Sequence, residues 1–212
     1  MARAGPRRST GNGRSRTDAA TRDPVPERLL RVATKLFADR GFEGTSVQEL
    51  VQAAGLTKGA MYHYFSSKDD LLYEIYARVL RLQMERLESI ASSAAALIER
   101  VHAAAADVVV TSIENLDDTK IFWRSMHQLN PDKQKTVRAE RRRYHERFRA
   151  MLQEGQESGL FRDDVPADLV IDFYFGAVHH LGMWYRQDKP LKAGDVGRYF
   201  ADLLIASLRP ER

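Results

Sequence analysis

The pattern of apolar positions predicts a chain built from α-helices. From Pro24 onward, apolar residues recur every three to four positions, which is the period of an amphipathic helix. No segment alternates residues rich in Val, Ile and Thr, so no strand is indicated. The pattern predicts helices over about 29–40, 46–53, 57–64, 67–90, 93–116, 121–129, 132–157, 164–184 and 193–208. The predicted fold class is therefore all-α.

A short stretch in the first third of the chain predicts two small helices joined by a tight turn. Thr45 is placed to cap the first of them through its hydroxyl, and Thr57 is placed to cap the second. Gly55 lies between them, where the chain reverses and a positive φ is favourable. Met61 and Phe65, four residues apart, give the second helix a buried face. This is the helix-turn-helix arrangement, which places one helix in the major groove of DNA.

The outward face of the second small helix has the chemistry of a nucleic-acid contact. Lys58, Tyr62 and His63 are left pointing away from the buried face, and Gly59 permits close approach of the backbone. Lysine, tyrosine and capping hydroxyls commonly contact phosphates, and lysine or histidine can reach base edges. Lys68 is placed to reach a flanking phosphate. The alternative is a helical corner with incidental polar residues, which the agreement of so many positions disfavours.

Composition excludes several classes of protein. At 43% hydrophobic and 29% charged residues, the 212-residue chain is typical of globular proteins and can form one good-sized domain, or a small domain on a larger one. No run approaches the roughly 18–20 apolar residues of a membrane span, and no apolar run follows the N-terminal arginines as in a secretory signal. The absence of cysteine excludes disulfides, thiolate metal sites and a cysteine nucleophile. We therefore expect a cytoplasmic protein with no membrane partner.

Residues 1–23 are predicted to be a disordered basic tail. They hold six arginines against Asp18 and Asp23, which accounts for the whole formal net charge of +4. Gly, Ser, Thr and Pro fill the gaps, and too few apolar side chains are present to offset the entropy of ordering the segment. Two roles stay open: a solubilising leader, or an arm on DNA phosphates or in a minor groove that adds salt-dependent affinity.

A specific set of residues between about Glu27 and Tyr76 resembles the DNA-binding domain of TetR-family transcriptional regulators. The matching positions are Ala33, Phe37, Arg40-Gly41-Phe42, Thr45, Val47, Ala54-Gly55-Leu56, Gly59, Tyr62-His63, Phe65, Lys68 and Leu71. Two positions depart from the family pattern: Val51, where Ala is usual, and Asp69, where Glu is common. Neither departure alters the assignment.

The resemblance implies a division of the chain and a way of binding DNA. Residues 24–72 are the implied helix-turn-helix DNA-binding domain, and residues 73–212 are the implied helical ligand-binding and dimerisation domain. A homodimer would place its two third helices in successive major grooves of a palindromic, double-stranded operator. The implied phosphate contacts are Thr45, Thr57, Tyr62 and Lys68, and the candidates for reading bases are Lys58, Ala60 and His63, with Gly59 at the closest approach.

The second half of the chain resembles one branch of that family. The similar segments are Leu152-Gln-Glu-Gly155, Gly159-Leu-Phe161-Arg162, Asp168-Leu-Val, Trp184-Tyr-Arg186, Pro190-Leu and Val196-Gly197. Members of this branch govern fatty-acid and steroid-ring catabolism in actinobacteria and related bacteria, and several respond to CoA thioesters. The resemblance therefore implies a small-molecule effector such as an acyl-CoA.

An acyl-CoA combines an apolar group with several phosphates, so its site should mix aromatic residues with arginines. The candidate ligand-binding residues are Phe122, Trp123, Met126, Phe148, Phe173, Trp184 and Arg186. Aromatic residues at helical spacing are also common in cores. The arginine run 141–143, interleaved with glutamates, also fits a solvated helix face. For both sets, the binding role and the purely structural role stay open.

The penultimate and last helices are expected to form the homodimer. Gly176, Ala177 and Gly182 make a strip of small residues that would admit a partner helix, giving an intersubunit four-helix bundle. His179 and His180 are adjacent, so they point about 100° apart on a helix and cannot readily share a metal ion. We predict neither a metal site nor a cofactor.

The leading hypothesis is a repressor that a ligand releases from its operator. An enzyme carrying a DNA-binding head is disfavoured, because no paired carboxylates, nucleophile elbow or glycine-rich phosphate loop is found. The chain is therefore predicted not to be an enzyme. Two further functions stay open: a constitutive DNA-binding protein without a ligand, and a regulator of drug efflux that senses a hydrophobic compound.

Overall fold

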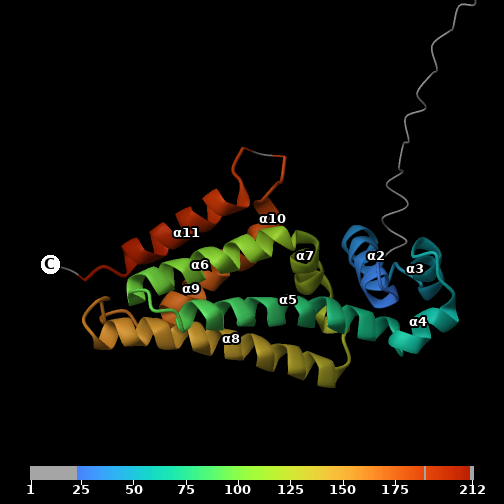
Figure 1. The fold of residues 1–212 in the computed structure, drawn as a ribbon, viewed down its shortest axis with the longest axis horizontal. Coiled ribbons are helices and arrows are strands. Elements are labelled where there is room, and N and C mark those ends of the chain that lie inside the picture. Colours follow the sequence, from blue (N-terminus) through green and yellow to red (C-terminus); the bar gives the residue numbers. More distant parts are fainter. Residues whose placement is uncertain (1–22, 189, 211–212) are drawn as a thin grey trace, which may run out of the picture.

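The computed structural model describes residues 23–188 and 190–210, and every regular element within them is helical (Figure 1). The elements are α2 (Val25–Arg40), α3 (Val47–Ala53), α4 (Lys58–Tyr64), α5 (Lys68–Ala91), α6 (Leu97–Glu114), α7 (Leu116–Ser125), the 3-10 turn η1 (Met126–Gln128), α8 (Pro131–Glu157), α9 (Ala167–His179), α10 (Leu181–Trp184) and α11 (Ala193–Ser207). The all-α prediction is confirmed. The predicted basic tail, apart from Asp23, lies outside the described residues.

Helices α2, α3 and α4 pack with the start of α5 into a small head at one end of the molecule (Figure 1). The head core is formed by fully buried side chains from all four helices, including Leu29, Phe37, Leu50, Met61 and Leu71. Gly41 ends α2 with a φ of 83°, a conformation that favours glycine. Gly55, with a φ of 63°, makes the turn between α3 and α4 as expected.

Side-chain caps fix where the short helices begin. Thr57 accepts a hydrogen bond from the backbone N–H of Ala60, which caps α4 as predicted. The cap of α3 differs from the prediction, because Ser46 rather than Thr45 holds that position. The Ser46 hydroxyl accepts from the N–H of Glu49, and the Glu49 carboxylate accepts from the N–H of Ser46. This reciprocal capping box leaves the Thr45 hydroxyl for another use.

The larger body is built around the long helix α5, which starts in the head and runs through most of the body (Figure 1). Helix α8 lies alongside α5, and α6 packs between α5 and α11. The core of this body gathers buried side chains from α5, α6, α8, α9, α10 and α11. Tyr174 of α9 reaches into it and donates its hydroxyl hydrogen to the carbonyl of Ala105.

The head and the body share part of their buried core. Ile121 of α7, Leu129 after η1 and Val137 of α8 are buried among the head side chains, and Phe122 and Met126 pack against the same cluster. The sequence-based boundary between residues 72 and 73 therefore falls inside a continuous helix, with α7 and the start of α8 contributing to both parts. Helix α7 is therefore in direct contact with the head core.

Several helix boundaries differ from those predicted. Helix α6 begins at Leu97 rather than residue 93, after a turn in which the Glu99 carboxylate accepts from the N–H of Ala96. Helix α7 begins at Leu116 and ends at Ser125. The single helix expected over 164–184 is broken at His180, where the backbone N–H bonds to Ala177 rather than Gly176. Within the described residues, no helix is long and apolar enough to cross a membrane.

Candidate nucleic-acid interface and effector cavity

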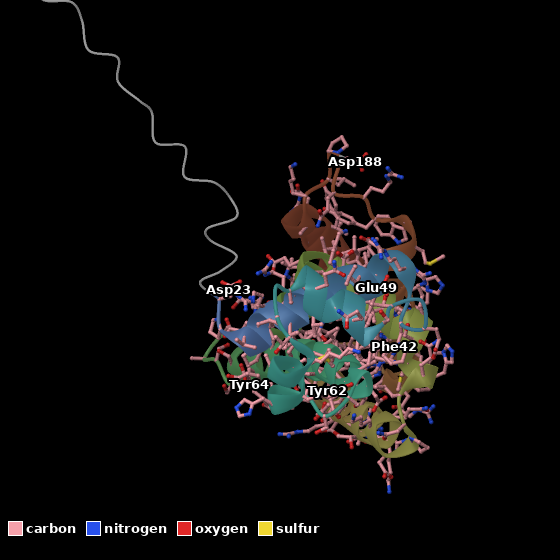
Figure 2. All side chains as sticks on the ribbon, turned by 90° about the vertical axis from the view of Figure 1, so that its right-hand side faces the viewer. Asp23, Phe42, Glu49, Tyr62, Tyr64 and Asp188 are labelled. Atoms are coloured by element: carbon pink, nitrogen blue, oxygen red, sulfur yellow. The ribbon has the colours of Figure 1, made fainter. Side chains whose placement is uncertain are left out.

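Helix α4 presents its polar face at the exposed end of the head. Met61 is fully buried, whereas Lys58, Tyr62 and His63 are exposed. Tyr62 is 50% exposed, and Figure 2, which looks onto this end, shows it at the surface together with Tyr64. Tyr64 was not among the predicted contacts; its ring meets that of His63 edge to face at 4.8 Å. A short helix with this face outward is shaped to enter a groove of DNA.

Gly59 lies on the same face with free space around it. A Cβ built on Gly59 would meet only the Thr57 hydroxyl oxygen, at 3.8 Å, and the φ of Gly59 is not positive. The folded chain itself therefore does not require glycine here. A surface that must come close to the backbone of α4 does supply a reason for it.

Two of the predicted DNA contacts have their side chains directed into the head. The buried Thr45 hydroxyl donates to the carbonyl of Gly41 at 2.8 Å. The Lys68 ammonium donates to the carbonyls of Phe42 and Thr45, at 2.8 and 3.0 Å, and lies 4.2 Å from the centre of the Phe42 ring. Both side chains position the loop between α2 and α3. A contact with DNA from either residue stays a prediction.

The start of α5 is tied to the start of α8 by a charged cluster. The Lys133 ammonium bonds to Asp69 at 2.5 Å and to Asp70, and the Asp69 carboxylate also accepts from the backbone and side-chain N–H groups of Asn130. Burial acts to raise the pKa of Asp70, but hydrogen bonds from Lys133 and Ser67 outweigh it and hold that pKa below its usual value. The departure from the family pattern at Asp69 thus has a structural role.

A small cavity lies inside the larger body, between α5, α6, α7, α8 and α9. This inner cavity has a volume of about 80 Å³ and is lined by Ile75, Tyr76, Val79, Leu80, Gln83, Ser112, Asp118, Thr119, Phe122, Trp123, Arg141 and His179. A second cavity of about 60 Å³ shares Leu80, Gln83, Ser112, Arg141 and His179 with it and extends to Tyr144, His145 and Phe175. In each, apolar and aromatic side chains make up about half of the lining, beside Arg141, His179 and other polar groups.

Arg141 is the charged group at the meeting point of these cavities. Its guanidinium carbon lies 5.2 Å from the centre of the Phe122 ring and 4.9 Å from that of Trp123. One guanidinium nitrogen is 3.0 and 2.9 Å from the two ring nitrogens of His179, and it donates to whichever of them is unprotonated. Burial lowers the pKa of Arg141 and, with the Arg141 charge, lowers the pKa of His179 to about 3 and that of His145 to about 4.

A groove of about 510 Å³ opens from Arg141 and His145 to the surface between α8 and α9. It is lined by Arg138, Arg141, Arg142, His145, Glu146, Arg149, Asp168, Ile171 and Asp172. Arg149 is paired with Asp168 at 3.1 Å, which removes one positive charge from the groove. The outer face of α8 beside it carries Lys135, Arg138, Arg142 and Arg143 with Glu146. We call this set the α8 arginine stripe; it is net positive.

The structure brings together only some of the predicted ligand residues. Phe122 and Trp123 line the inner cavity, and Met126 packs against the head core beside them. Phe148 is buried in the body core against Tyr174 and Phe175, and lines neither cavity. Two others, Phe173 and Trp184, are exposed on the surface formed by α9 to α11. Arg186 is paired with Asp188 and lines a separate cleft.

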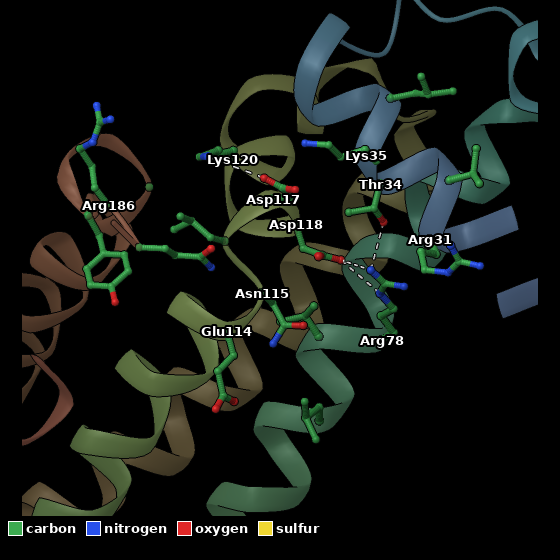
Figure 3. Close-up of a pocket in the computed structure, with 18 of the residues that line it drawn as sticks. Arg31, Thr34, Lys35, Arg78, Glu114, Asn115, Asp117, Asp118, Lys120 and Arg186 are labelled. Atoms are coloured by element: carbon green, nitrogen blue, oxygen red, sulfur yellow. Dashed lines mark hydrogen bonds and ion pairs between the residues drawn. The ribbon is translucent and has the colours of Figure 1, made fainter. Parts of the chain in front are cut away.

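That separate cleft, of about 1350 Å³, lies between α2, α5, α7 and the segment after α10 (Figure 3). On its wall the Arg78 guanidinium bonds to the Asp118 carboxylate at 2.5 and 3.1 Å and donates to the Thr34 hydroxyl at 3.0 Å (Figure 3). Burial raises the pKa of Asp118 although Arg78 acts to lower it. Asp118 lines the inner cavity as well as this cleft. One carboxylate therefore touches the cavity and is linked through Arg78 to α2.

Several of these residues carried no signal in the sequence. Arg78 is 44 positions from Thr34 and 40 positions from Asp118, so their spacing reveals nothing. Arg141 lies in a run of three arginines, and the sequence alone does not reveal which of them faces the interior. Of the two adjacent histidines, His179 faces the cavities and His180 is exposed. Within the described part of the chain, no group of three or more His, Asp or Glu side chains is placed to hold a metal ion.

The head presents a capped α4 with its polar face outward. It is joined through α5 and α7 to a helical body that contains cavities. These two parts together are typical of a DNA-binding regulator. A family model for "Bacterial regulatory proteins, tetR family" matches residues 29–75, and one for "Tetracyclin repressor-like, C-terminal domain" matches residues 94–208. The chain belongs to the TetR family of transcriptional regulators, which bind operator DNA through this head and are not enzymes. The predicted family and the predicted lack of enzymatic activity are confirmed.

Similar proteins span nearly the whole chain. The transcriptional repressor KstR2 of Mycolicibacterium smegmatis is 28% identical over 195 residues, which cover 86% of this chain and 89% of KstR2. The structure of the regulator PfmR from Thermus thermophilus is 34% identical with a TM-score of 0.79, and the match covers 87% of this chain and all of PfmR. A structure of AibR in complex with isovaleryl coenzyme A and operator DNA matches with a TM-score of 0.74 at 24% identity, over 89% of this chain and all of AibR.

Proposed function

We propose that this protein is a homodimeric repressor that binds a palindromic operator and is released when a small effector occupies the inner cavity. The observation that carries the proposal is the position of Asp118. Its carboxylate forms part of the cavity wall and bonds to Arg78, which in turn bonds to Thr34 in the head. An effector that displaces α7 changes this link, so cavity occupancy and head position are coupled through direct contacts.

On the DNA side, the exposed face of α4 carries the contacts. Tyr62 and the N-terminus of α4 bind phosphates, and Lys58 and His63 read base edges in the major groove. Two heads related by two-fold symmetry then require two inverted half-sites. The exposed apolar side chains of α9, α10 and α11 supply the dimer surface, since large apolar side chains exposed on a protomer mark an interaction site.

On the effector side, the preferred candidate is an acyl-CoA thioester. The inner cavity offers aromatic walls to an acyl group, and the groove and the α8 arginine stripe offer guanidinium groups to phosphates. AibR shares the fold and is named for a complex with isovaleryl coenzyme A, but at 24% identity this likeness shows the fold alone. The support therefore comes from the residues of this chain.

The test is fluorescence anisotropy on the DNA upstream of the protein's own gene, titrated with short- and long-chain acyl-CoA thioesters and their free acids. We expect tight binding without ligand and release by a thioester, with a change in operator affinity of about 5- to 150-fold. Operator binding that no member of the panel alters would favour a constitutive DNA-binding protein. Release by uncharged or cationic hydrophobic drugs alone would favour a regulator of drug efflux.

The link from the cavity to the head predicts a loss of coupling in Thr34→Val and Arg78→Met. Thr34→Val removes the hydroxyl that accepts from Arg78, and Arg78→Met removes the bonds to both Thr34 and Asp118. The ratio of operator Kd with and without the releasing thioester should fall by about 2- to 30-fold, corresponding to about 0.5–2 kcal/mol, and more in Arg78→Met. The measurement is the same anisotropy titration with each variant.

The matched control is Arg81→Met, one turn along α5. Arg81 forms its ion pair with Glu74 of the same helix and does not bridge to α2. This variant should keep the wild-type ratio. If Arg78→Met and Arg81→Met gave the same ratio of operator Kd with and without the thioester, the effector would act on the head without the Arg78 contacts to Thr34 and Asp118.

A further inference from the structure

Three hollows of the larger body meet at one side chain. Arg141 lines the inner cavity, the second cavity and the surface groove, whereas His145 and His179 each line two of them. We propose that Arg141 binds an oxygen acceptor of the effector, either a carboxylate or the carbonyl of its thioester, where the apolar part enters the inner cavity. This inference rests on the proposed function, because it takes the inner cavity as the effector site.

The first argument is the unmet charge of Arg141. Among the described residues, its hydrogen bonds are those to the ring of His179, and no carboxylate pairs with it. A guanidinium has five N–H donors, so most of them are left for another acceptor. Arg141 is half-buried where the groove opens, and the faces of Phe122 and Trp123 supply only part of the stabilisation that its charge needs there. An oxygen atom of the effector would accept a hydrogen bond from the remaining N–H groups of Arg141.

The second argument is that several other polar groups of the inner cavity already have partners within the fold. The Ser112 hydroxyl donates to the carbonyl of Val108 at 2.7 Å, and the Tyr76 hydroxyl donates to a backbone carbonyl of α7 at 3.1 Å. The Asp118 carboxylate is ion-paired with Arg78, whose two bonds both end on Oδ1. A cationic ligand would therefore face the charge of Arg141, and the Asp118 carboxylate on the cavity wall is already ion-paired with Arg78. The polarity of the site selects acceptors and disfavours cations.

The third argument is the state of the two histidines. Burial and the Arg141 charge lower the pKa of His145 to about 4 and that of His179 to about 3, so both rings are neutral at pH 7. Of these three side chains only Arg141 is charged, and a neutral His179 holds the guanidinium in place by accepting from it. The acceptor site is thus preformed before the effector arrives.

Cavity size limits the part of the effector that lies inside. A cavity of about 150 Å³ holds a benzene molecule in a well-studied case, and the inner cavity has about 80 Å³. The buried part is therefore a chain of a few carbon atoms. The remainder lies outward along the groove of about 510 Å³, past Arg138 and Arg142. A fused-ring lipid would need the walls of the inner cavity to move.

The test uses three probes of matched length on the full chain without DNA: butyryl-coenzyme A, butyrate and butyltrimethylammonium. Isothermal titration should show binding of the thioester, the carboxylate or both, and none of the cation. Arg141→Met should weaken that binding by at least about thirtyfold, because it removes a charge-assisted bond. Arg141→Lys should retain part of the affinity, since it keeps the charge without the planar fork. Binding of the thioester alone would place its carbonyl rather than a carboxylate at Arg141.

The matched control is Arg147→Met on the same helix. Arg147 pairs with Glu88 of α5 and lines none of the three hollows, so this variant should bind the probes as the wild type does. Thermal melting checks that each variant is folded. Three results would each overturn the inference. The first is equal binding by Arg141→Met and wild type, and the second is binding of the cation. The third is no binding of either oxygenated probe at about 10 mM, the weak end of measurable affinity. Failure of the proposed function looks different: the probe binds the wild type, yet operator affinity is unchanged.

Discussion

Gly59→Ala is expected to stabilise the free protein slightly and to abolish tight operator binding. The added methyl meets only the Thr57 hydroxyl oxygen, at 3.8 Å, so the fold accepts it. Alanine favours helix over glycine, and we expect a gain of about 0.5 kcal/mol in the free energy of unfolding. At the DNA surface the same methyl occupies space between the α4 backbone and the groove. A penalty of about tenfold in affinity per head becomes about a hundredfold for a symmetric dimer.

The measurements are urea unfolding and operator anisotropy on the same preparations. Gly194→Ala is the matched control, because its Cβ meets nothing within 4 Å and it lies in the first turn of α11, outside the head. It should gain similar stability and keep full operator affinity. If Gly59→Ala binds the operator as tightly as Gly194→Ala, the α4 backbone does not approach DNA closely. The docking geometry would then have to be redrawn.

The head could be predicted from sequence because its signals are local. Thr57, Gly55 and Met61 each act on residues within four positions, and the structure shows the cap, the turn and the buried face that they predict. The misplaced cap at Thr45 has the same local origin. Two neighbouring hydroxyl residues compete for one position, and Glu49 decides in favour of Ser46 by completing the capping box. Which of the two hydroxyl residues caps the helix depends on the local backbone geometry, which residue types alone do not reveal.

The interior of the body could not be predicted, because it depends on contacts between distant residues. Phe148 and Phe122 have the same side chain and both lie on amphipathic helices, yet one fills the core and the other lines a cavity. The difference follows from the neighbours that α9 and α5 bring to each site. Arg141 differs from Arg142 and Arg143 in the same way, since its place on the helical turn sets it against Trp123 while the others face outward. Periodicity indicates a face but not what the face meets.

The outer surface of α9 to α11 leads to the second large prediction. Phe173 and Leu203 are 76% and 70% exposed, and Met183 is 85% exposed. Helix α9 also carries a buried face, with Val170, Tyr174 and Val178 in the core, so it is apolar on two sides. Large apolar side chains exposed on the face opposite the core mark an interaction site, and the partner protomer of the proposed dimer would cover them.

Phe173→Glu should convert the dimer to monomers and thereby remove operator binding. Two-fold symmetry puts two carboxylates in one interface, each at a desolvation cost of several kcal/mol, so the dimer Kd should rise more than about a thousandfold. Because the Phe173 side chain is largely exposed in the protomer, the far-ultraviolet circular dichroism should not change. Sedimentation equilibrium measures the association, and Gln153→Glu on the exposed face of α8 adds the same charge as a control. A variant that stays dimeric would place the interface on another surface, whereas a monomer that still bound the operator tightly would remove the two-fold argument for a palindrome.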